Sequence, residues 1–131
     1  MRAAYLDTSL LVAIAFGEPG ADRLQSKMNA IDVLYSSTLL EAEFLSVVER
    51  EGVRSQAGTH LHPIRWIHPD RTLTGEINRI LDHGFLRGAD LHHLASALFL
   101  FPKPSEAFFL TLDEKQDAAA IELGFKGLIT L

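Results

Sequence analysis

Short apolar runs alternate with longer segments of helical spacing along this chain. The apolar runs predict buried strands: AAYL at 3–6, IDVLYSS at 31–37, IRWI at 64–67 and AFFLTL at 107–112. A last strand is predicted for GLITL at 127–131. Strands that are apolar on both faces are typical of a parallel sheet covered by helices on both sides.

The segments between these runs repeat apolar residues every three to four positions, which predicts helices. The first helix is expected to be capped by Thr8 or Ser9 and to end at Gly17. Further helices are predicted at 19–28, 38–52, 70–84, 88–101 and 113–124, while 53–61 is either a helix or a loop.

Strands that alternate with helices in this order predict an α/β fold. We expect a three-layer α/β/α sandwich with a short central parallel sheet. No internal repeat, low-complexity tract or linker divides the sequence, so residues 1–131 are expected to form a single domain.

Composition narrows the possible functions. The chain has no cysteine, which excludes disulfides, thiolate zinc sites and a cysteine nucleophile and favours a reducing cytoplasmic location. A carboxylate at Asp7 and the turn GEPG at 17–20 interrupt the N-terminal apolar stretch, so no membrane span is expected. The net charge of −5 argues against a broad basic surface, and any contact with nucleic acid must be local.

Acidic residues stand where predicted strands end or helices begin. Asp7 follows the first strand directly and Asp113 follows FFLTL in the same way, while Asp90 begins the helix at 88–101. Glu41 and Glu43 lie at the start of the helix after VLYSS. Parallel strands place their carboxyl ends at one crevice, so these acids are expected to meet there. Taken singly, each could also be a helix cap or an ordinary first-turn acid.

Acids gathered at one crevice need a cation among them. Two carboxylates about 6 Å apart repel by roughly 3 kcal/mol at an effective dielectric near 20. A site made of oxygen ligands without cysteine suits Mg²⁺ or Mn²⁺ better than zinc. Without Asp7, Glu43, Asp90 and Asp113, the formal charge of −5 would fall to −1, so most of the net acidity lies in this one set of residues.

Four segments together resemble a known family: YLDTSLLVAIAFGEPG, SSTLLEAEFLSVVER, LRGADLHHLASAL and TLDEKQDAAAIELGF. In order and spacing they are similar to the four acidic motifs of PIN-domain ribonucleases, particularly the small VapC-type toxins of prokaryotic toxin–antitoxin pairs. The resemblance covers essentially the whole chain. Asp7 matches the first acidic position, Asp90 the third and Asp113 the fourth. Glu43 matches the second better than Glu41 does.

The resemblance implies a metal-dependent endoribonuclease that hydrolyses RNA phosphodiester bonds with a metal-activated water. It implies Mg²⁺ or Mn²⁺ held by the four acids, an antitoxin protein as partner, and a homodimer. Arg87 matches a basic residue often found before the third acid, where it could contact phosphate, or be a solvated or salt-bridged loop arginine. Ser9 and Thr111 flank the acids and could hydrogen-bond the carboxylates, a metal-bound water or the substrate, or serve as plain cap and strand-end residues. His93 matches a histidine that is common in the family, and we expect it to pack and hydrogen-bond.

Two other functions of α/β proteins with acids at strand ends fit the sequence less well. A phosphatase with Asp7 as nucleophile would require a second acid at position 9, which is serine, and a phospho-receiver domain would require a strand-end lysine that the chain lacks. A noncatalytic PIN-like module that binds RNA or protein is the remaining alternative.

Overall fold

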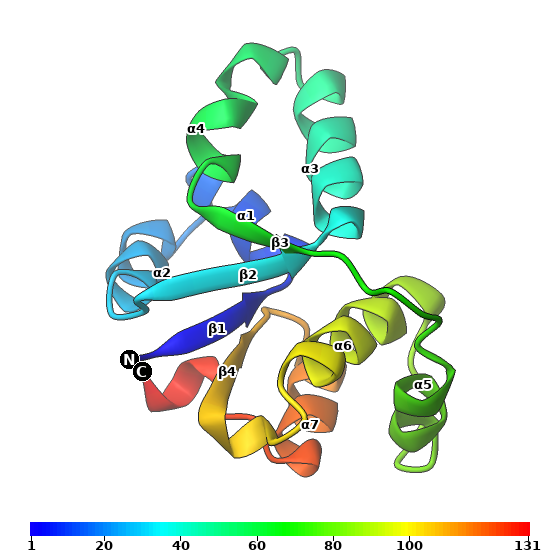
Figure 1. The fold of residues 1–131 in the computed structure, drawn as a ribbon. Coiled ribbons are helices and arrows are strands. Elements are labelled where there is room, and N and C mark those ends of the chain that lie inside the picture. The colour runs from blue at the N-terminus through cyan, green and yellow to red at the C-terminus, as the bar shows by residue number, and fades with distance from the viewer.

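The computed structural model describes all residues from Met1 to Leu131. Four parallel strands form its central sheet: β1 (Ala3–Leu6), β2 (Val33–Ser37), β3 (Ile64–Ile67) and β4 (Ala107–Leu110). Their order is β3-β2-β1-β4, so the first strand lies at the centre between the second and the fourth (Figure 1).

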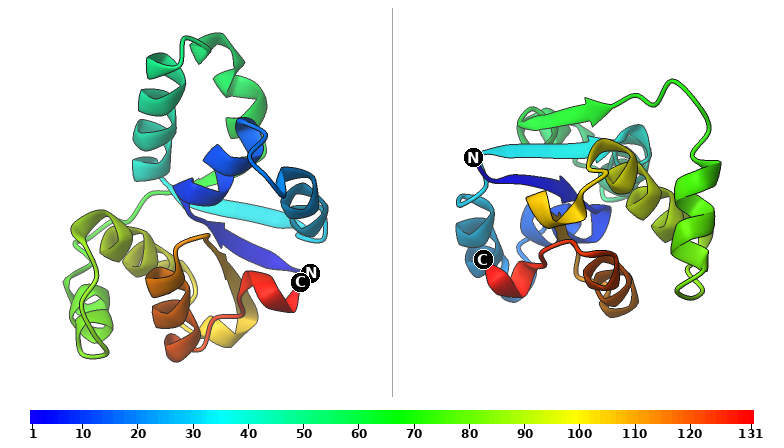
Figure 2. Two further views of the ribbon diagram at one scale, coloured as in Figure 1. Left: turned by 180° about the vertical axis from the view of Figure 1, so that it is seen from behind. Right: turned by 60° about the horizontal axis from the view of Figure 1, so that its bottom comes forward.

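Helices cover both faces of this sheet (Figure 2). The α-helices are α1 (Thr8–Ala15), α2 (Ala21–Met28), α3 (Thr38–Arg50), α4 (Ala57–Leu61), α5 (Thr74–Leu81), α6 (Gly88–Leu100) and α7 (Glu114–Leu123). Three 3₁₀ helices complete the chain: η1 (Arg54–Gln56), η2 (Pro104–Glu106) and η3 (Leu128–Thr130). The predicted three-layer α/β/α class is confirmed. No helix has the length and apolar character needed to cross a membrane.

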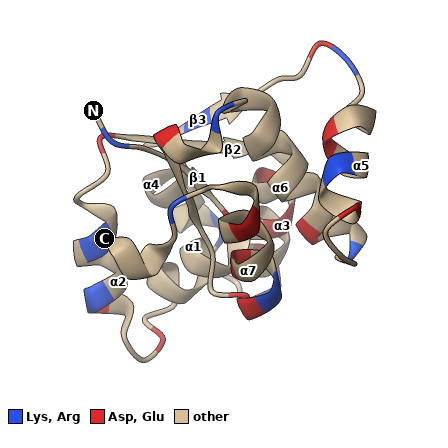
Figure 3. Ribbon diagram, turned by 90° about the horizontal axis from the view of Figure 1, so that it is seen from below, with Lys and Arg blue, Asp and Glu red and all other residues tan.

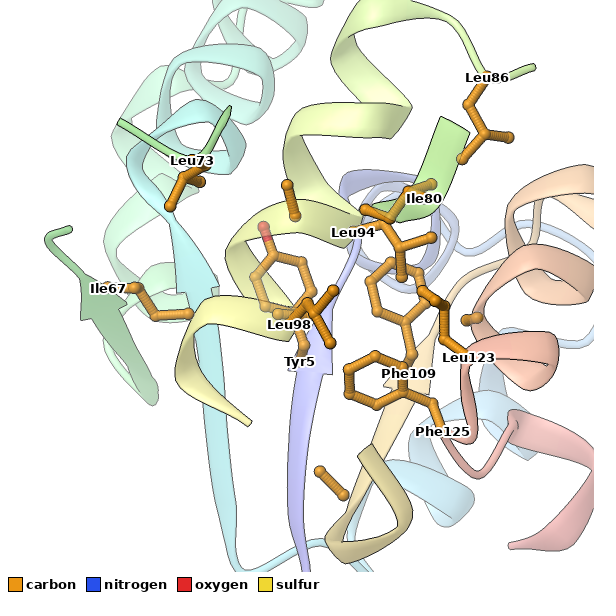
Figure 4. Packing of buried hydrophobic residues seen from close by; sticks show 14 residues of the cluster. Tyr5, Ile67, Leu73, Ile80, Leu86, Leu94, Leu98, Phe109, Leu123 and Phe125 are labelled. Carbon is orange, nitrogen blue, oxygen red and sulfur yellow. The ribbon is translucent and has the colours of Figure 1, made fainter. Parts of the chain in front are cut away.

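The sheet separates two apolar cores. Tyr5 of β1 and Phe109 of β4 project from one face, where their rings stack with centroids 5.3 Å apart under α5, α6 and α7 (Figure 4). Leu6 and Leu110, one position further along each strand, project from the opposite face into a core completed by α1 to α4. This alternation follows from the two-residue period of a strand.

The predicted strand at 127–131 is wrong, because the chain forms η3 there. Only one isolated bridge, between Phe108 and Lys126, continues the ladder beyond β4. Leu128 and Leu131 both pack on the core shared with α1 to α4. Residues three apart lie on the same side of a 3₁₀ turn but on opposite faces of a strand, so packing favours the turn.

Two helix starts also differ from the prediction. Asp7, and not Thr8 or Ser9, caps α1, because its carboxylate accepts a hydrogen bond from the backbone N–H of Ser9. The helix α5 begins at Thr74, after Leu73 has been buried in the core. The uncertain segment 53–61 forms η1 and α4.

Candidate functional site

Asp7 lies at the carboxyl end of the central strand and is almost fully buried. Its Oδ2 accepts hydrogen bonds from Ser9 Oγ at 2.6 Å, Thr111 Oγ1 at 3.0 Å and Ser9 N at 3.3 Å. Its Oδ1 accepts none and lies 3.7 Å from Nε2 of His93, which is too far for a hydrogen bond. Three donors thus fix one carboxylate oxygen and leave the other for a further partner.

Asp90 and Asp113 come from the starts of α6 and α7. Burial raises the pKa of Asp90, the like charges of Asp113 and Asp7 raise it further, and Arg87 and His93 oppose the shift. The three acids therefore lie close enough to interact, although they come from three separate segments. Asp113 also acts as the N-cap of α7, where Oδ1 accepts a hydrogen bond from Gln116 N at 2.8 Å.

Glu43 lies in α3 and reaches this group through its neighbours. Its Oε1 accepts a hydrogen bond from Thr8 Oγ1 at 2.8 Å and lies 2.7 Å from His93 Nε2. No hydrogen bond or ion pair is formed by the side chain of Glu41, on the same helix. Of the two candidate glutamates, Glu43 is thus the one bound to His93, whose Nε2 lies 3.7 Å from Asp7.

A cavity of about 90 Å³ adjoins two of the acids. It is lined by Phe85, Leu86, Arg87, Asp90, Asp113 and Lys115. Elsewhere the cations are scattered among acidic residues and are not gathered on one face (Figure 3). The basic residues next to the acids are thus a local pair, Arg87 and Lys115, and not part of a broad basic surface.

A family model described as "PIN domain" matches residues 4–122. The chain is a PIN-domain protein. PIN domains are generally nucleases that use divalent metal ions. The family match includes all four acidic positions: Asp7, Glu43, Asp90 and Asp113.

A solved structure agrees with this PIN fold. The chain superposes with a TM-score of 0.69 on a chain of VapBC2 from Rickettsia felis, crystallised bound to a DNA fragment from their promoter. The two share 16% sequence identity, and the alignment covers 95% of this chain and 96% of the other. A comparison with curated protein sequences finds no match.

The acids of this PIN domain suit a hard divalent cation in their chemistry. As the side chains lie, no three His, Asp or Glu groups are arranged to hold one ion. Mg²⁺ does not require such a cage, because it keeps several waters and takes one or two carboxylates together with substrate phosphate. Asp7 Oδ1 receives no hydrogen bond. Asp90 and Asp113 are half-buried, and the charges of Asp113 and Asp7 both raise the pKa of Asp90. These residues fit a metal that is completed by water and substrate.

Two buried polar side chains of the PIN domain, Gln116 and Tyr5, support the site although no sequence motif marks them as site residues. Gln116 is fully buried; its Oε1 lies 2.9 Å from Thr111 Oγ1, and its Nε2 donates to the Asp90 carbonyl at 3.1 Å. Tyr5 Oη contacts His93 Nδ1. The spacing of Gln116, Ala120 and Leu123, the buried stripe of α7, is a signal that could have found Gln116. Nothing in the sequence points to the contact of Tyr5.

Proposed function

We propose that this PIN domain is a metal-dependent endoribonuclease that hydrolyses RNA phosphodiester bonds, and that Asp7, Glu43, Asp90 and Asp113 form its active site. The main support is the gathering of acids at the carboxyl edge of a PIN sheet: Asp90 and Asp113 line one cavity, Asp7 is buried at the end of β1, and burial and then the charges of Asp113 and Asp7 raise the pKa of Asp90. Like charges at such a distance are costly without a cation. A noncatalytic scaffold would have no use for that cost.

Each acid has a distinct place in the proposal. Asp7, Asp90 and Asp113 would hold Mg²⁺ or Mn²⁺, which supplies a water of lowered pKa and polarises the phosphate when bound. Ser9 and Thr111 keep Asp7 oriented through Oδ2. Both hydrogen bonds to Glu43 go to Oε1, which leaves Oε2 to bind a water or to share in holding the cation.

Arg87 is the proposed phosphate contact of the site. It caps the start of α6, three residues before Asp90, and its charge is felt by that carboxylate. A guanidinium offers a planar pair of donors that matches two phosphate oxygens. Arg87 borders the same cavity as Asp90 and Asp113, where it could hold a phosphate beside the acids.

We further propose that the chain is the toxin of a toxin–antitoxin pair that acts in the cytoplasm. The structural neighbour is a VapBC2 assembly, which supports an antitoxin protein as partner. Large apolar side chains remain exposed, among them Leu81 and Ile121, and we propose that the chain forms a homodimer. Sedimentation of the purified chain, alone and with its antitoxin, measures both assemblies.

The test of the nuclease uses a mixed RNA pool with Mg²⁺, with Mn²⁺ and with EDTA. Cleavage should require a metal and should be lost in Asp90→Asn, whereas Asp82→Asn, an exposed acid at the end of α5, should cleave like the wild type. Titration calorimetry should detect metal binding by the wild type and not by Asp90→Asn. Absence of both cleavage and metal binding would refute the nuclease and favour a noncatalytic RNA- or protein-binding PIN module.

A further inference from the structure

Phe85 stands out among the aromatic residues because 71% of its surface is exposed. Its backbone is held in place on both sides: Leu86 is buried in the core with Leu94, and His83 Nδ1 lies 3.2 Å from Glu122 Oε1 of α7. These two contacts hold the loop at 83–86 in place, and its Phe85 ring is exposed to solvent. An exposed ring of this size costs hydrophobic free energy, which favours a role in binding.

The ring lies on the rim of the 90 Å³ cavity that adjoins Asp90 and Asp113. Because Phe85 and the two acids border the same cavity, a base held next to the acids would lie over this rim, against the face of the ring that Lys115 does not cover.

Two cations flank the ring. Lys115, in the first turn of α7, places Nζ 5.4 Å from the centroid of the Phe85 ring, and Arg87 follows two residues after Phe85 in the chain. An exposed aromatic ring with two cations on the same cavity matches a nucleotide strand, in which a flat base alternates with phosphates. The same cations offset the repulsion that the two carboxylates exert on an approaching backbone.

We propose that Phe85 is a stacking platform for one unpaired base of single-stranded RNA beside the Asp90 and Asp113 site, with Lys115 and Arg87 contacting the adjoining phosphates. The inference rests on the proposed function, since it names the form of RNA that the site takes. Bases inside an A-form helix are already stacked and paired, so only a single-stranded segment can offer a base to the ring.

Binding is measured in EDTA, so that affinity is separated from cleavage. The probes are a labelled single-stranded RNA of mixed sequence with one 2-aminopurine, and the blunt duplex of the same sequence. Phe85→Leu should weaken binding of the single strand about tenfold and abolish the stacking change of 2-aminopurine fluorescence. Phe85→Trp should keep both, and Phe16→Leu, at another exposed phenylalanine, should match the wild type. Binding of the duplex should not depend on residue 85.

The outcomes separate this inference from the nuclease proposal. Binding of the single strand that depends on Phe85, without metal-dependent cleavage, would support the platform and refute the nuclease. Cleavage with equal binding by wild type and Phe85→Leu would refute the platform alone. If wild type binds no RNA, the platform is wrong. If Phe85→Leu instead weakens self-association or antitoxin binding, Phe85 is a protein contact and the platform is also wrong.

Discussion

The Tyr5 hydroxyl oxygen and His93 Nδ1 lie 2.6 Å apart and form a hydrogen bond in the buried interior. The other ring nitrogen, Nε2, lies 2.7 Å from the Glu43 carboxylate, which can only accept, so Nε2 carries a hydrogen. Burial also raises the pKa of Tyr5 to about 12, so the hydroxyl keeps its proton.

Tyr5→Phe should therefore weaken both stability and cleavage. The variant keeps the ring stacked on Phe109 but leaves His93 Nδ1 and the Ser37 N–H without their partner, at a cost of about 1–3 kcal/mol. Glu43 loses a fixed donor, and we expect a fall in kcat with little change in KM. Thermal unfolding and steady-state cleavage measure the two effects. Tyr35→Phe, whose hydroxyl forms no hydrogen bond, is the matched control, and equal losses in both variants would contradict the role of Tyr5.

The pair Glu43→Gln and Glu41→Gln tests which glutamate serves the site. Glutamine at position 43 can still accept from Thr8 and His93, so unfolding should change little, while loss of the charge should lower the cleavage rate about 100-fold or more. Glu41→Gln should stay within about twofold of wild type. A larger loss of cleavage in Glu41→Gln than in Glu43→Gln would reverse the assignment.

Addition and removal of metal should reverse the stability order of wild type and Asp90→Asn. In EDTA at neutral pH, the charged Asp90 of the wild type is destabilised by burial and by repulsion from Asp113 and Asp7. Asp90→Asn removes that charge and should therefore be at least as stable. Mg²⁺ at about ten times its Kd should stabilise the wild type by about 1.4 kcal/mol and the variant by nothing comparable. Calorimetric melting at both conditions measures the crossover. Parallel Mg²⁺ responses in the two proteins would speak against a role of Asp90 in metal binding.

The folding stability of the protein should depend on pH through Asp117, a residue outside the proposed active site. Burial raises its pKa above the ordinary value, and its Oδ1 is buried without a hydrogen-bond partner. The folded state therefore binds this proton more tightly than the unfolded state, and stability falls as pH rises through the window between the ordinary and the raised pKa. Asp117→Asn should be more stable than wild type at pH 7 by less than about 1 kcal/mol, since solvent screens much of the effect, and equal near pH 3.

Denaturant unfolding at both pH values measures this difference. Asp82→Asn, an exposed acid of α5, controls for the loss of one negative charge from the surface. A gain in stability at pH 3 as large as that at pH 7 would exclude the titration of Asp117 as the cause.

The sequence was sufficient for the sheet because each of β1 to β4 is a local apolar run. The failure at 127–131 shows the limit: GLITL satisfies a strand pattern, but the core lies on the side that Leu128 and Leu131 share. Local composition cannot tell which long-range surface a terminal segment will meet.

The candidate site shows the same division. The positions of the acids could be predicted, since Asp7 and Asp113 follow strands and Asp90 begins a helix. The bond between Tyr5 and His93 joins residues 88 positions apart, and Gln116 contacts the backbone of Asp90 across 26 positions. Such partners depend on how helices settle on the sheet, which no spacing in the chain encodes.

The single bridge at Lys126 has a consequence for how the protein behaves at high concentration. Its N–H donates to the Ala107 carbonyl and its carbonyl accepts from Phe109 N–H, so the outer rim of β4 is already hydrogen-bonded where η3 begins. An open strand rim invites pairing with other chains and aggregation. With that rim occupied, β3 is the side of the sheet left to pair, and there Arg65 is exposed on a strand of only four residues. Lys126 thus covers part of the edge of β4 and disfavours edge-to-edge association of chains there.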